Sequence, residues 1–335
     1  MPDDCLPTAT IDVLQRRARL LAEVRRFFDE RGYFEVETPL LSHDVCVDAW
    51  LDPFIVPDVA PGGGAVPMYL QTSPEFAMKR LLVAGAEAIY QVTRSFRRGE
   101  SGRLHNPEFT IVEWYRVGAT IQEQIDLIEE LARTVADLSS HGVYPRGALD
   151  QPFARLTYEA AFERFAGRRV LSASCEELAQ LAARHGVSVP PQFDHADRDA
   201  WLNLLLANVV EPRLKELRAV FLCDYPASQS ALARVRQDDP PVAERFELYL
   251  DGIEICNGYQ ELTDADELAA RMQRQAKLRH ANGLSELPTD SRLIAAMRLG
   301  LPECAGVALG FDRLALWALG GATIADVLAF PFDRA

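Results

Sequence analysis

The run FRRGESGRLHNPEFTIVEWY, residues 96–115, decides the fold of this 335-residue chain. It runs from the end of one stretch rich in β-branched and aromatic residues, 88–97, through a polar loop to a second such stretch, 109–115. Such an arrangement predicts an antiparallel hairpin with a long loop. Side chains two apart on the returning strand, such as Glu113 and Tyr115, share one face of that hairpin.

A second hairpin is predicted over 246–256, where Asp251-Gly252 is typical of a two-residue type I′ turn. Apolar residues at helical spacing predict helices over 11–31, followed by a capping glycine, and over 264–281. The shorter predicted elements are an edge strand at 33–38, a glycine turn at 62–64, a strand at 69–72, a helix at 74–83, a strand from Ala219, a strand at 307–309 and a helix from Leu314. Antiparallel hairpins with helices beside them indicate an α+β fold with an antiparallel sheet, and not a doubly wound parallel sheet.

Composition places the chain among ordinary folded proteins. Apolar residues make up 48% and charged residues 25%, which excludes the disordered, collagen-like and disulfide-scaffold classes. The six cysteines are scattered without a C-x-x-C pair, and no signal peptide or membrane segment is recognisable, so we expect a cytoplasmic protein. Residues 121–218 are mostly helical in pattern, which predicts a helical insertion within one catalytic domain spanning 1–335.

A basic segment stands out in a chain of net charge −14. Residues 79–116 carry seven basic against four acidic side chains, a net +3, whereas the rest of the chain carries −17. The guanidinium fork matches phosphate oxygens, so this segment predicts a site for a compact polyanion. Arg97 and either Arg103 or His105 are the candidate phosphate ligands, and Phe109 offers a stacking face. A merely solvated basic loop is the alternative.

Two glutamates flank the second hairpin turn. With a two-residue turn, Tyr249 lies opposite Glu254 and Glu247 opposite Cys256, so the two glutamates are diagonal neighbours on one face. Like charges this close predict a hard cation such as Mg²⁺, held by one or two carboxylates and by substrate phosphates. The alternative is an exposed sheet face on which both carboxylates are solvated.

Polar residues continue along the same strand. Asn257, Tyr259 and Glu261 alternate around Gly258, where a bulge would swing them onto the face of the glutamates. An amide, a phenol and a carboxylate in a row suit an amine substrate, and Glu113 beside a phenol on the first hairpin suits an ammonium group. For the first group, the alternative is an edge strand with one solvent-exposed face. For the second, it is a core tyrosine whose hydroxyl already has a hydrogen-bond partner.

The run GVALGFDRL, residues 306–314, is the last landmark. Gly310 permits close approach of a ligand to the backbone, Asp312 is expected to cap the following helix, and Arg313 in its first turn would point a second guanidinium into the site.

In this order, these landmarks resemble the three signature motifs of the class II aminoacyl-tRNA synthetases. RGYFEVETPLL resembles motif 1, the 96–115 run motif 2, and GVALGFDR motif 3, while HNPEFT and EICNGYQEL are typical of the lysine branch. The likeness extends from about Ile11 to Ala335, and it is greatest to the ligases that attach (R)-β-lysine to elongation factor P. Those ligases are truncated lysyl-tRNA synthetase paralogues. We expect no anticodon-binding domain, because the motif 1 helix starts so early.

The resemblance implies a role for each matching residue. Arg97 and Arg313 are the implied catalytic cations, at the α- and γ-phosphates of ATP. The implied ATP site comprises Arg97, Arg98, Gly99, Glu100, His105, Asn106, Phe109, Glu254, Ile255, Gly310 and Arg313. The implied lysine site comprises Ser73, Pro74, Glu75, Glu113, Tyr115, Asn257, Tyr259, Glu261 and Ala308. Glu247 and Glu254 are the implied Mg²⁺ ligands.

Two positions depart from the family pattern. Gly99 stands where motif 2 has a glutamate, and the acid is Glu100 instead. Ala308 stands in the small glycine-rich run of lysyl-tRNA synthetases. One added methyl there would favour β-lysine over α-lysine, by about 1 to 3 kcal/mol at most.

The resemblance therefore implies an enzyme that activates (R)-β-lysine with ATP and Mg²⁺ and transfers it to a lysine of elongation factor P. It also implies a homodimer formed through motif 1, and no transfer RNA partner. The alternatives are a lysine-activating enzyme with another acceptor, either a transfer RNA or another amine, and a catalytically silent lysine-binding regulator. The phosphate-binding and metal-binding charges expected to be lost in a silent protein are all present.

Overall fold

The computed structural model describes residues 5–57, 67–138 and 149–335. The glycine turn predicted at 62–64 lies outside these residues. Along the parts of the chain that are described, no helix is both long enough and apolar enough to cross a membrane.

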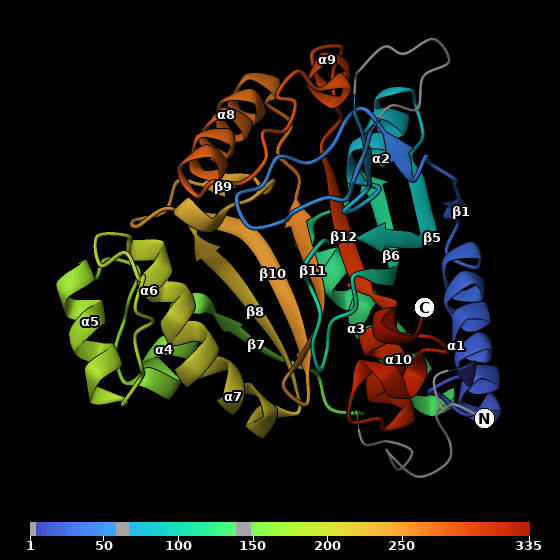
Figure 1. Cartoon of the computed structure of the whole chain (residues 1–335), viewed down its shortest axis with the longest axis horizontal. Coiled ribbons are helices and arrows are strands. Elements are labelled where there is room, and N and C mark those ends of the chain that lie inside the picture. Colours follow the sequence, from blue (N-terminus) through green and yellow to red (C-terminus); the bar gives the residue numbers. More distant parts are fainter. Residues whose placement is uncertain (1–4, 58–66, 139–148) are drawn as a thin grey trace.

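A large sheet forms the centre of the molecule (Figure 1). Its described strands are mainly antiparallel, and only the outermost pairs, β1 with β5 and β7 with β8, are parallel. In spatial order they are β1 (Phe34–Glu35), β5 (Ala88–Phe96), β6 (Glu108–Val117), β12 (Cys304–Gly310), β11 (Ile253–Gln260), β10 (Val242–Leu250), β8 (Ala219–Pro226) and β7 (Ala154–Thr157), with β9 (Val235–Arg236) paired to β10. A small second sheet contains β2 (Leu41–Ser42), β4 (Met68–Leu70) and β3 (Ile55–Val56). The predicted α+β fold is confirmed.

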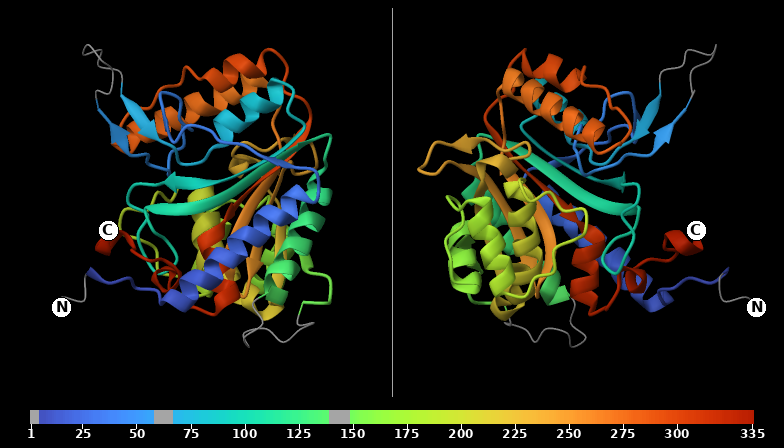
Figure 2. Two further views of the ribbon diagram at one scale, coloured as in Figure 1. Left: turned by 90° about the vertical axis from the view of Figure 1, so that its right-hand side faces the viewer. Right: turned by 60° about the vertical axis from the view of Figure 1, so that its left-hand side comes forward.

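Helices pack around this sheet in three groups (Figures 1 and 2). The first group shares the main core with the sheet and consists of α1 (Ile11–Asp29), α3 (Ile121–Leu138) and α10 (Phe311–Leu319). The second consists of α2 (Glu75–Val83), α8 (Ala265–Ala281) and α9 (Arg292–Met297). The third packs on β8 and β10 and consists of α4 (Tyr158–Ala166), α5 (Cys175–Arg184), α6 (Arg198–Leu205) and α7 (Glu211–Leu214), with a π-helical turn at Leu206–Val210. Short 3₁₀ turns lie at Lys215–Leu217, Ala227–Gln229, Ile324–Val327 and Phe332–Arg334.

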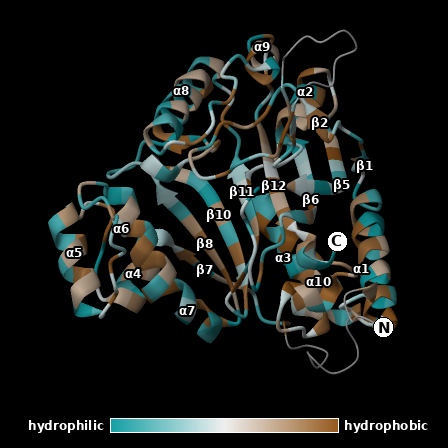
Figure 3. Ribbon diagram, in the orientation of Figure 1, coloured by the Kyte–Doolittle hydropathy of each residue, from teal (hydrophilic) through white to brown (hydrophobic). Residues whose placement is uncertain are grey.

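The first predicted helix is present, but it ends at Asp29, two residues earlier than predicted, and Glu30 rather than the following glycine is its C-cap. Thr10 accepts a hydrogen bond from the backbone N–H of Val13 and so caps α1. Polar and apolar residues alternate along this helix (Figure 3), and its apolar side packs into the main core through Leu20, Val24 and Phe27, among others. The edge strand predicted after it is present but is only two residues long.

The region 121–218 is mostly helical, as predicted, but it also contains strand β7, which the sequence pattern did not reveal. Its first helix, α3, packs in the main core, whereas α4 to α7 fill a separate core against β8 and β10. The division into one domain with an insertion stays a prediction.

Strand register divides the sheet into an apolar face and a polar face. On β6 and β12, Trp114 and Val307 point into the main core, while their neighbours point the other way. These neighbours form two rows that cross β6, β12, β11 and β10. The first row is Glu113, Ala308, Asn257 and Glu247, and the second is Tyr115, Gly306, Tyr259 and Arg245. Register alone therefore gathers polar residues from three separate parts of the sequence, namely β6, the β10–β11 hairpin and β12.

The turn between β10 and β11 is as predicted. Asp251 and Gly252 both have positive φ, 47° and 81°, as a type I′ turn requires. Tyr249 lies opposite Glu254 on the next strand, which confirms the predicted pairing beside the turn.

The register beyond that turn differs from the prediction. Glu247 lies opposite Asn257 and not opposite Cys256, because Ile255 is an extra residue on β11. The bulge was predicted at Gly258, but it lies three residues earlier. Its effect is the predicted one, because it brings Asn257 onto the face of the glutamates. The glycine has a packing role, because a Cβ there would lie 2.4 Å from the ring of the cross-strand phenylalanine.

The last helix corrects a second prediction. It begins at Phe311, three residues earlier than expected, and Gly310 occupies its N-cap position. Asp312 does not cap it. The Asp312 carboxylate accepts a hydrogen bond from the backbone N–H of Thr110 at 3.0 Å and pairs with Arg17 of α1 at 2.6 Å.

Candidate active site

A cavity of about 440 Å³ lies on the polar face of the sheet. Most of the residues predicted for the site line it: Ser73, Glu75, Arg97, Glu100, His105, Asn106, Phe109, Glu113, Tyr115, Glu254, Ile255, Asn257, Tyr259, Glu261, Ala308, Gly310 and Arg313. Five others do not line it, namely Pro74, Arg98, Gly99, Arg103 and Glu247. The cavity has two chemically different ends, which we call the acidic end and the arginine end.

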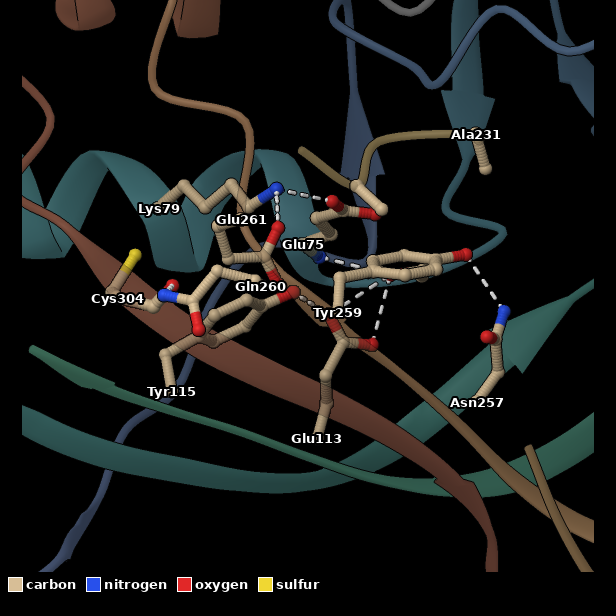
Figure 4. A network of polar contacts seen from close by, with 12 residues as sticks. Glu75, Lys79, Glu113, Tyr115, Ala231, Asn257, Tyr259, Gln260, Glu261 and Cys304 are labelled. Atoms are coloured by element: carbon tan, nitrogen blue, oxygen red, sulfur yellow. Dashed lines mark hydrogen bonds and ion pairs between the residues drawn. The ribbon is translucent and has the colours of Figure 1, made fainter. Parts of the chain in front are cut away.

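Helix α2 and the end of β11 build the acidic end (Figure 4). Glu75 opens α2, and Lys79 follows one turn later on the same face. The Lys79 ammonium lies 2.6 Å from Glu75 Oε1 and 2.5 Å from Glu261 Oε2. Burial alone would lower the pKa of Lys79, but the two carboxylates more than offset this and hold that pKa above its ordinary value. Lys79 is therefore a permanent internal cation.

The charge pattern of the sequence places Lys79 only in the basic segment 79–116 and does not predict that it lies among the carboxylates. The signal that could have revealed its position was its spacing of four residues from Glu75, which is typical of a helical ion pair.

Glu113 completes the acidic end. Its carboxylate accepts hydrogen bonds from the Tyr115 hydroxyl at 2.5 Å and the Ser73 hydroxyl at 2.9 Å. Burial, and then the nearby Glu75 carboxylate, raise the pKa of Glu113 to about 8. Burial likewise raises the pKa of Glu261 to about 7, although Lys79 acts against this rise.

The acidic end has unused capacity for a cation. Glu261 is fully buried, and no hydrogen bond reaches its Oε1 from any residue that the structure describes. Gly306 permits this arrangement, because a Cβ at that position would lie 2.5 Å from Glu261 Oε1 and 2.3 Å from the Tyr115 ring. Three carboxylates around one ammonium leave an excess of negative charge. Buried charges require partners, so this end is suited to a ligand that carries ammonium groups.

The end of β5 and the following loop begin the arginine end. The Arg97 guanidinium lies 5.0 Å from the centre of the Phe109 ring. Its polar contacts are long, at 3.5 Å to the carbonyl oxygen of Thr72 and 3.8 Å to the Glu100 carboxylate. Most of its hydrogen-bonding capacity is therefore free to serve an anion in the cavity.

Arg313 is the second cation at this end. It donates hydrogen bonds to the backbone oxygen of Glu254 at 3.0 Å, to Glu254 Oε2 at 3.1 Å and to His105 Nε2 at 2.5 Å. Burial, and then the Arg313 charge, lower the pKa of His105, which keeps the imidazole neutral and able to accept this bond. Phe109 and Arg313 both line the cavity, as an adenine sandwich requires.

Other predicted nucleotide ligands occupy different places. Asn106 lines the cavity, but its amide oxygen also accepts a hydrogen bond from the backbone of Phe332. Arg98 points away and pairs with Asp52 at 2.5 Å. Arg103 donates to the carbonyl oxygen of Ala322. Of the two predicted loop residues, His105 therefore reaches the cavity and Arg103 does not.

Glu247 belongs to a buried network beside the cavity. Its carboxylate accepts hydrogen bonds from Tyr225 at 2.5 Å, Tyr249 at 2.7 Å and Arg245 at 2.5 Å. Arg245 also donates to Asn257 at 3.2 Å, and it does line the cavity. The solvated-glutamate alternative is wrong, since only 7% of Glu247 is exposed. Sequence reasoning missed Arg245, although it occupies the same strand face as Glu247.

This geometry fits a family of known proteins. Residues 4–334 match the family model of class II tRNA synthetases (D, K and N). The chain belongs to this family. A class II relative from Vibrio cholerae serotype O1, named elongation factor P--(R)-beta-lysine ligase, is 45% identical over 99% of both chains. Relatives of the same name from Salmonella dublin and Yersinia enterocolitica are each 43% identical over 98% of both chains. The predicted resemblance, including the ligase class, is confirmed.

The two predicted Mg²⁺ ligands, Glu254 and Glu247, differ in how well their surroundings suit a metal ion. Glu254 fits, because it lines the cavity, Arg313 contacts only its Oε2, and burial followed by the charge of Glu247 raises its pKa. Glu247 fits less directly, because protein donors already contact both of its oxygens. No cluster of three metal-ligating side chains occurs among the described residues. One carboxylate plus substrate phosphates is sufficient for Mg²⁺.

Proposed function

We propose that this protein is an ATP-dependent ligase that activates (R)-β-lysine as its adenylate and transfers it to the ε-amino group of a lysine on elongation factor P. The names of its relatives support the substrate and the acceptor. The two ends of the cavity support the chemistry, because one suits a compact polyanion and the other suits an amino acid with two ammonium groups.

The observation that carries this proposal is the unpartnered Glu261 Oε1 in a buried pocket that already contains Lys79. With all groups ionised, Glu75, Glu113 and Glu261 exceed that one ammonium by two charges. A diamino acid neutralises this excess. Glu75 would bind the amine nearer the reacting carboxylate, and Glu261 with Tyr115 would bind the terminal ammonium.

Activation requires a cation at the α-phosphate. A carboxylate oxygen of the amino acid attacks the α-phosphorus, and pyrophosphate leaves. Arg97 would neutralise the charge that develops there, and its weak contacts in the free protein make it available for this role. Arg313 would bind the γ-phosphate and cover the adenine opposite Phe109. No residue has to act as a covalent nucleophile, because positioning and charge supply the catalysis.

Mg²⁺ would be held by Glu254 and by the phosphates of ATP, where it would neutralise charge on the leaving pyrophosphate. Arg245 lines the same cavity, and Glu247 would hold its guanidinium in place. In the second step the uncharged acceptor amine attacks the carbonyl carbon of the adenylate, AMP leaves, and the nitrogen loses a proton.

The test is the intact mass of elongation factor P after incubation with this protein, ATP, Mg²⁺ and either α-lysine or (R)-β-lysine. We expect one added β-lysyl group, and more product with the β-isomer. Transfer RNA charging, assayed in parallel, should be absent. Pyrophosphate exchange that depends on lysine, without any mass increase, would contradict the proposed acceptor and retain the activation step. Absence of both would favour a silent regulator.

We also propose that the protein is a cytoplasmic homodimer whose interface includes α1 and β1. Two large apolar side chains, Ile11 and Phe34, are 63% and 54% exposed on these elements, and exposed apolar groups on an edge favour association. Light scattering should give twice the chain mass of 37.3 kDa. A monomeric mass would contradict the proposal.

A further inference from the structure

One large aromatic side chain stands exposed at the rim of the cavity. Trp50 has 74% of its surface accessible and still contributes to the cavity lining. The other three tryptophans of the chain, Trp114, Trp201 and Trp317, are buried. Tryptophan is enriched among residues that dominate protein interfaces, so an isolated exposed one beside a reaction cavity needs a physical explanation.

The loop that carries Trp50, residues 48–52, is held rigidly. Asp48 Oδ1 accepts hydrogen bonds from the backbone N–H groups of Trp50 at 2.7 Å and Leu51 at 3.0 Å. From α8, the fully buried Arg279 donates to the carbonyl oxygens of Asp48 and Leu51, both at 2.9 Å. The Asp52 carboxylate completes this set, at 2.8 Å from Arg279.

This loop is also attached to the arginine end of the cavity. Asp52 pairs with Arg98, the neighbour of Arg97, and its carbonyl oxygen accepts the Arg98 backbone N–H at 2.7 Å. A buried guanidinium is costly unless it is fully paired. Here that group serves to fix a surface loop, so Trp50 is presented in a preorganised position, which lowers the cost of binding a partner.

A second cavity adjoins the same loop. It has a volume of about 210 Å³ and shares Asp48, Ala231 and Leu232 with the main cavity. Its other lining includes the charged residues Glu267, Arg271 and Arg274 as well as neutral polar ones. The rim beside Trp50 therefore offers an aromatic contact and an adjacent polar hollow.

We propose that the 48–52 loop is the docking surface for the acceptor protein, with Trp50 packing against the chain beside the acceptor lysine. This inference rests on the proposed function. A lysine side chain has a four-carbon stem, so its amine can enter the main cavity only if its backbone lies at the rim. The net charge of −14 disfavours a nucleic acid as the occupant.

The test separates activation from transfer. In full-length Trp50→Ala, pyrophosphate exchange that depends on lysine should be unchanged, because Trp50 is 74% exposed at the rim of the cavity. Transfer to elongation factor P, followed by intact mass at several acceptor concentrations, should lose about tenfold or more in kcat/KM, through KM. Trp50→Phe should recover most of the loss. Leu299→Ala is the matched control, since Leu299 is 84% exposed and lines neither cavity.

Transfer by Trp50→Ala at the wild-type rate would overturn the docking surface while leaving the proposed function intact. A parallel loss of pyrophosphate exchange would also overturn it, because Trp50 would then serve the nucleotide. An effect of the substitution on transfer RNA charging alone would assign the loop to a different acceptor. A wild-type protein that exchanges pyrophosphate but never modifies elongation factor P would defeat the proposed function itself.

Discussion

The two ends of the cavity differ in how completely they are formed before any ligand binds. At the acidic end, the buried Lys79 forms short ion pairs with the buried Glu261 and with the partly buried Glu75. At the arginine end, Arg97 has only long contacts, and Arg313 is occupied by Glu254 and by a neutral histidine. One end is therefore preorganised, whereas the other has to exchange protein partners for phosphates.

This difference assigns different tasks to the two ends. A rigid buried pocket discriminates between ligands, because a wrong group leaves buried charges unpaired. Arginines with weak or replaceable partners suit a polyanion whose charge changes during the reaction. Substitutions at the acidic end should consequently change the KM for the amino acid, and substitutions at the arginine end should change the rate of activation.

The largest effect is expected for Arg97→Ala. Loss of this guanidinium should lower the rate of adenylate formation by about 10²- to 10³-fold or more, measured as pyrophosphate exchange that depends on lysine. The melting temperature should stay unchanged, because the contacts of Arg97 within the protein are long. Arg94→Ala is the control, since this exposed arginine of β5 pairs with Glu108 at 3.6 Å and does not line the cavity. Pyrophosphate exchange that persists in Arg97→Ala would contradict the assignment of the arginine end to the phosphates of ATP.

Glu261→Gln tests the acidic end. The amide keeps the shape but removes the charge, so Lys79 would face the substrate ammonium with one carboxylate fewer. We expect the KM for lysine to rise about 10- to 100-fold, the value of a charge-assisted hydrogen bond, with the KM for ATP unchanged. Glu303→Gln is the control, because Glu303 pairs at the surface with Arg234. Equal changes in both KM values would show that the two ends do not act separately.

The pH dependence gives a third test. Glu113 and Glu261, with pKa values of about 8 and about 7, are partly protonated near neutral pH in the free protein. They face Glu75, Lys79 and Tyr115, and a diammonium ligand would bind their ionised forms. The KM for lysine should therefore fall as pH rises from 6 to 8, and Glu113→Gln should flatten the upper part of this change. A KM independent of pH would contradict the assignment.

Glu113 and Glu261 also affect the stability of the folded protein. A rise in pH that strengthens lysine binding should weaken this stability. Both carboxyl groups have a pKa in the folded protein above the ordinary 4.5, so the folded state binds more protons than the unfolded state. The free energy of unfolding should thus decrease as pH rises from about 5 to 8. Lysine should restore it, and the rise in melting temperature on adding lysine should be larger at pH 8 than at pH 6.

Much of this site was predictable because it rests on local patterns. Alternation placed Glu113 with Tyr115 and Asn257 with Tyr259, and the Asp251-Gly252 turn fixed the pairing beside it. The position of the bulge was not predictable, because an extra residue at Ile255 leaves no compositional signal. Long-range contacts were also missed.

Two of the missed contacts show the physical reason. Asp312 looked like a local helix cap, but its partners lie on α1 and β6, about 200 to 300 residues away in the chain. Lys79 looked like one more member of a basic segment, but it is turned toward Glu261. Only the assembled tertiary structure decides which of several possible partners a charged side chain takes.

The smallest effect is expected at Ala308, which lines the cavity. On β12 it lies between Glu113 of β6 and Asn257 of β11, so its methyl group faces the pocket floor. Ala308→Gly removes that methyl and should increase the use of α-lysine relative to (R)-β-lysine by about tenfold, since one methylene-sized change contributes about 1 to 3 kcal/mol. Ala308→Val should weaken both isomers, because the added carbons fill the same space. If the isomer ratio is unchanged in both variants, the charges around Glu75 and not the methyl group of Ala308 discriminate between α-lysine and (R)-β-lysine. The difference between the rigid end and the adaptable end would then be one of electrostatics alone.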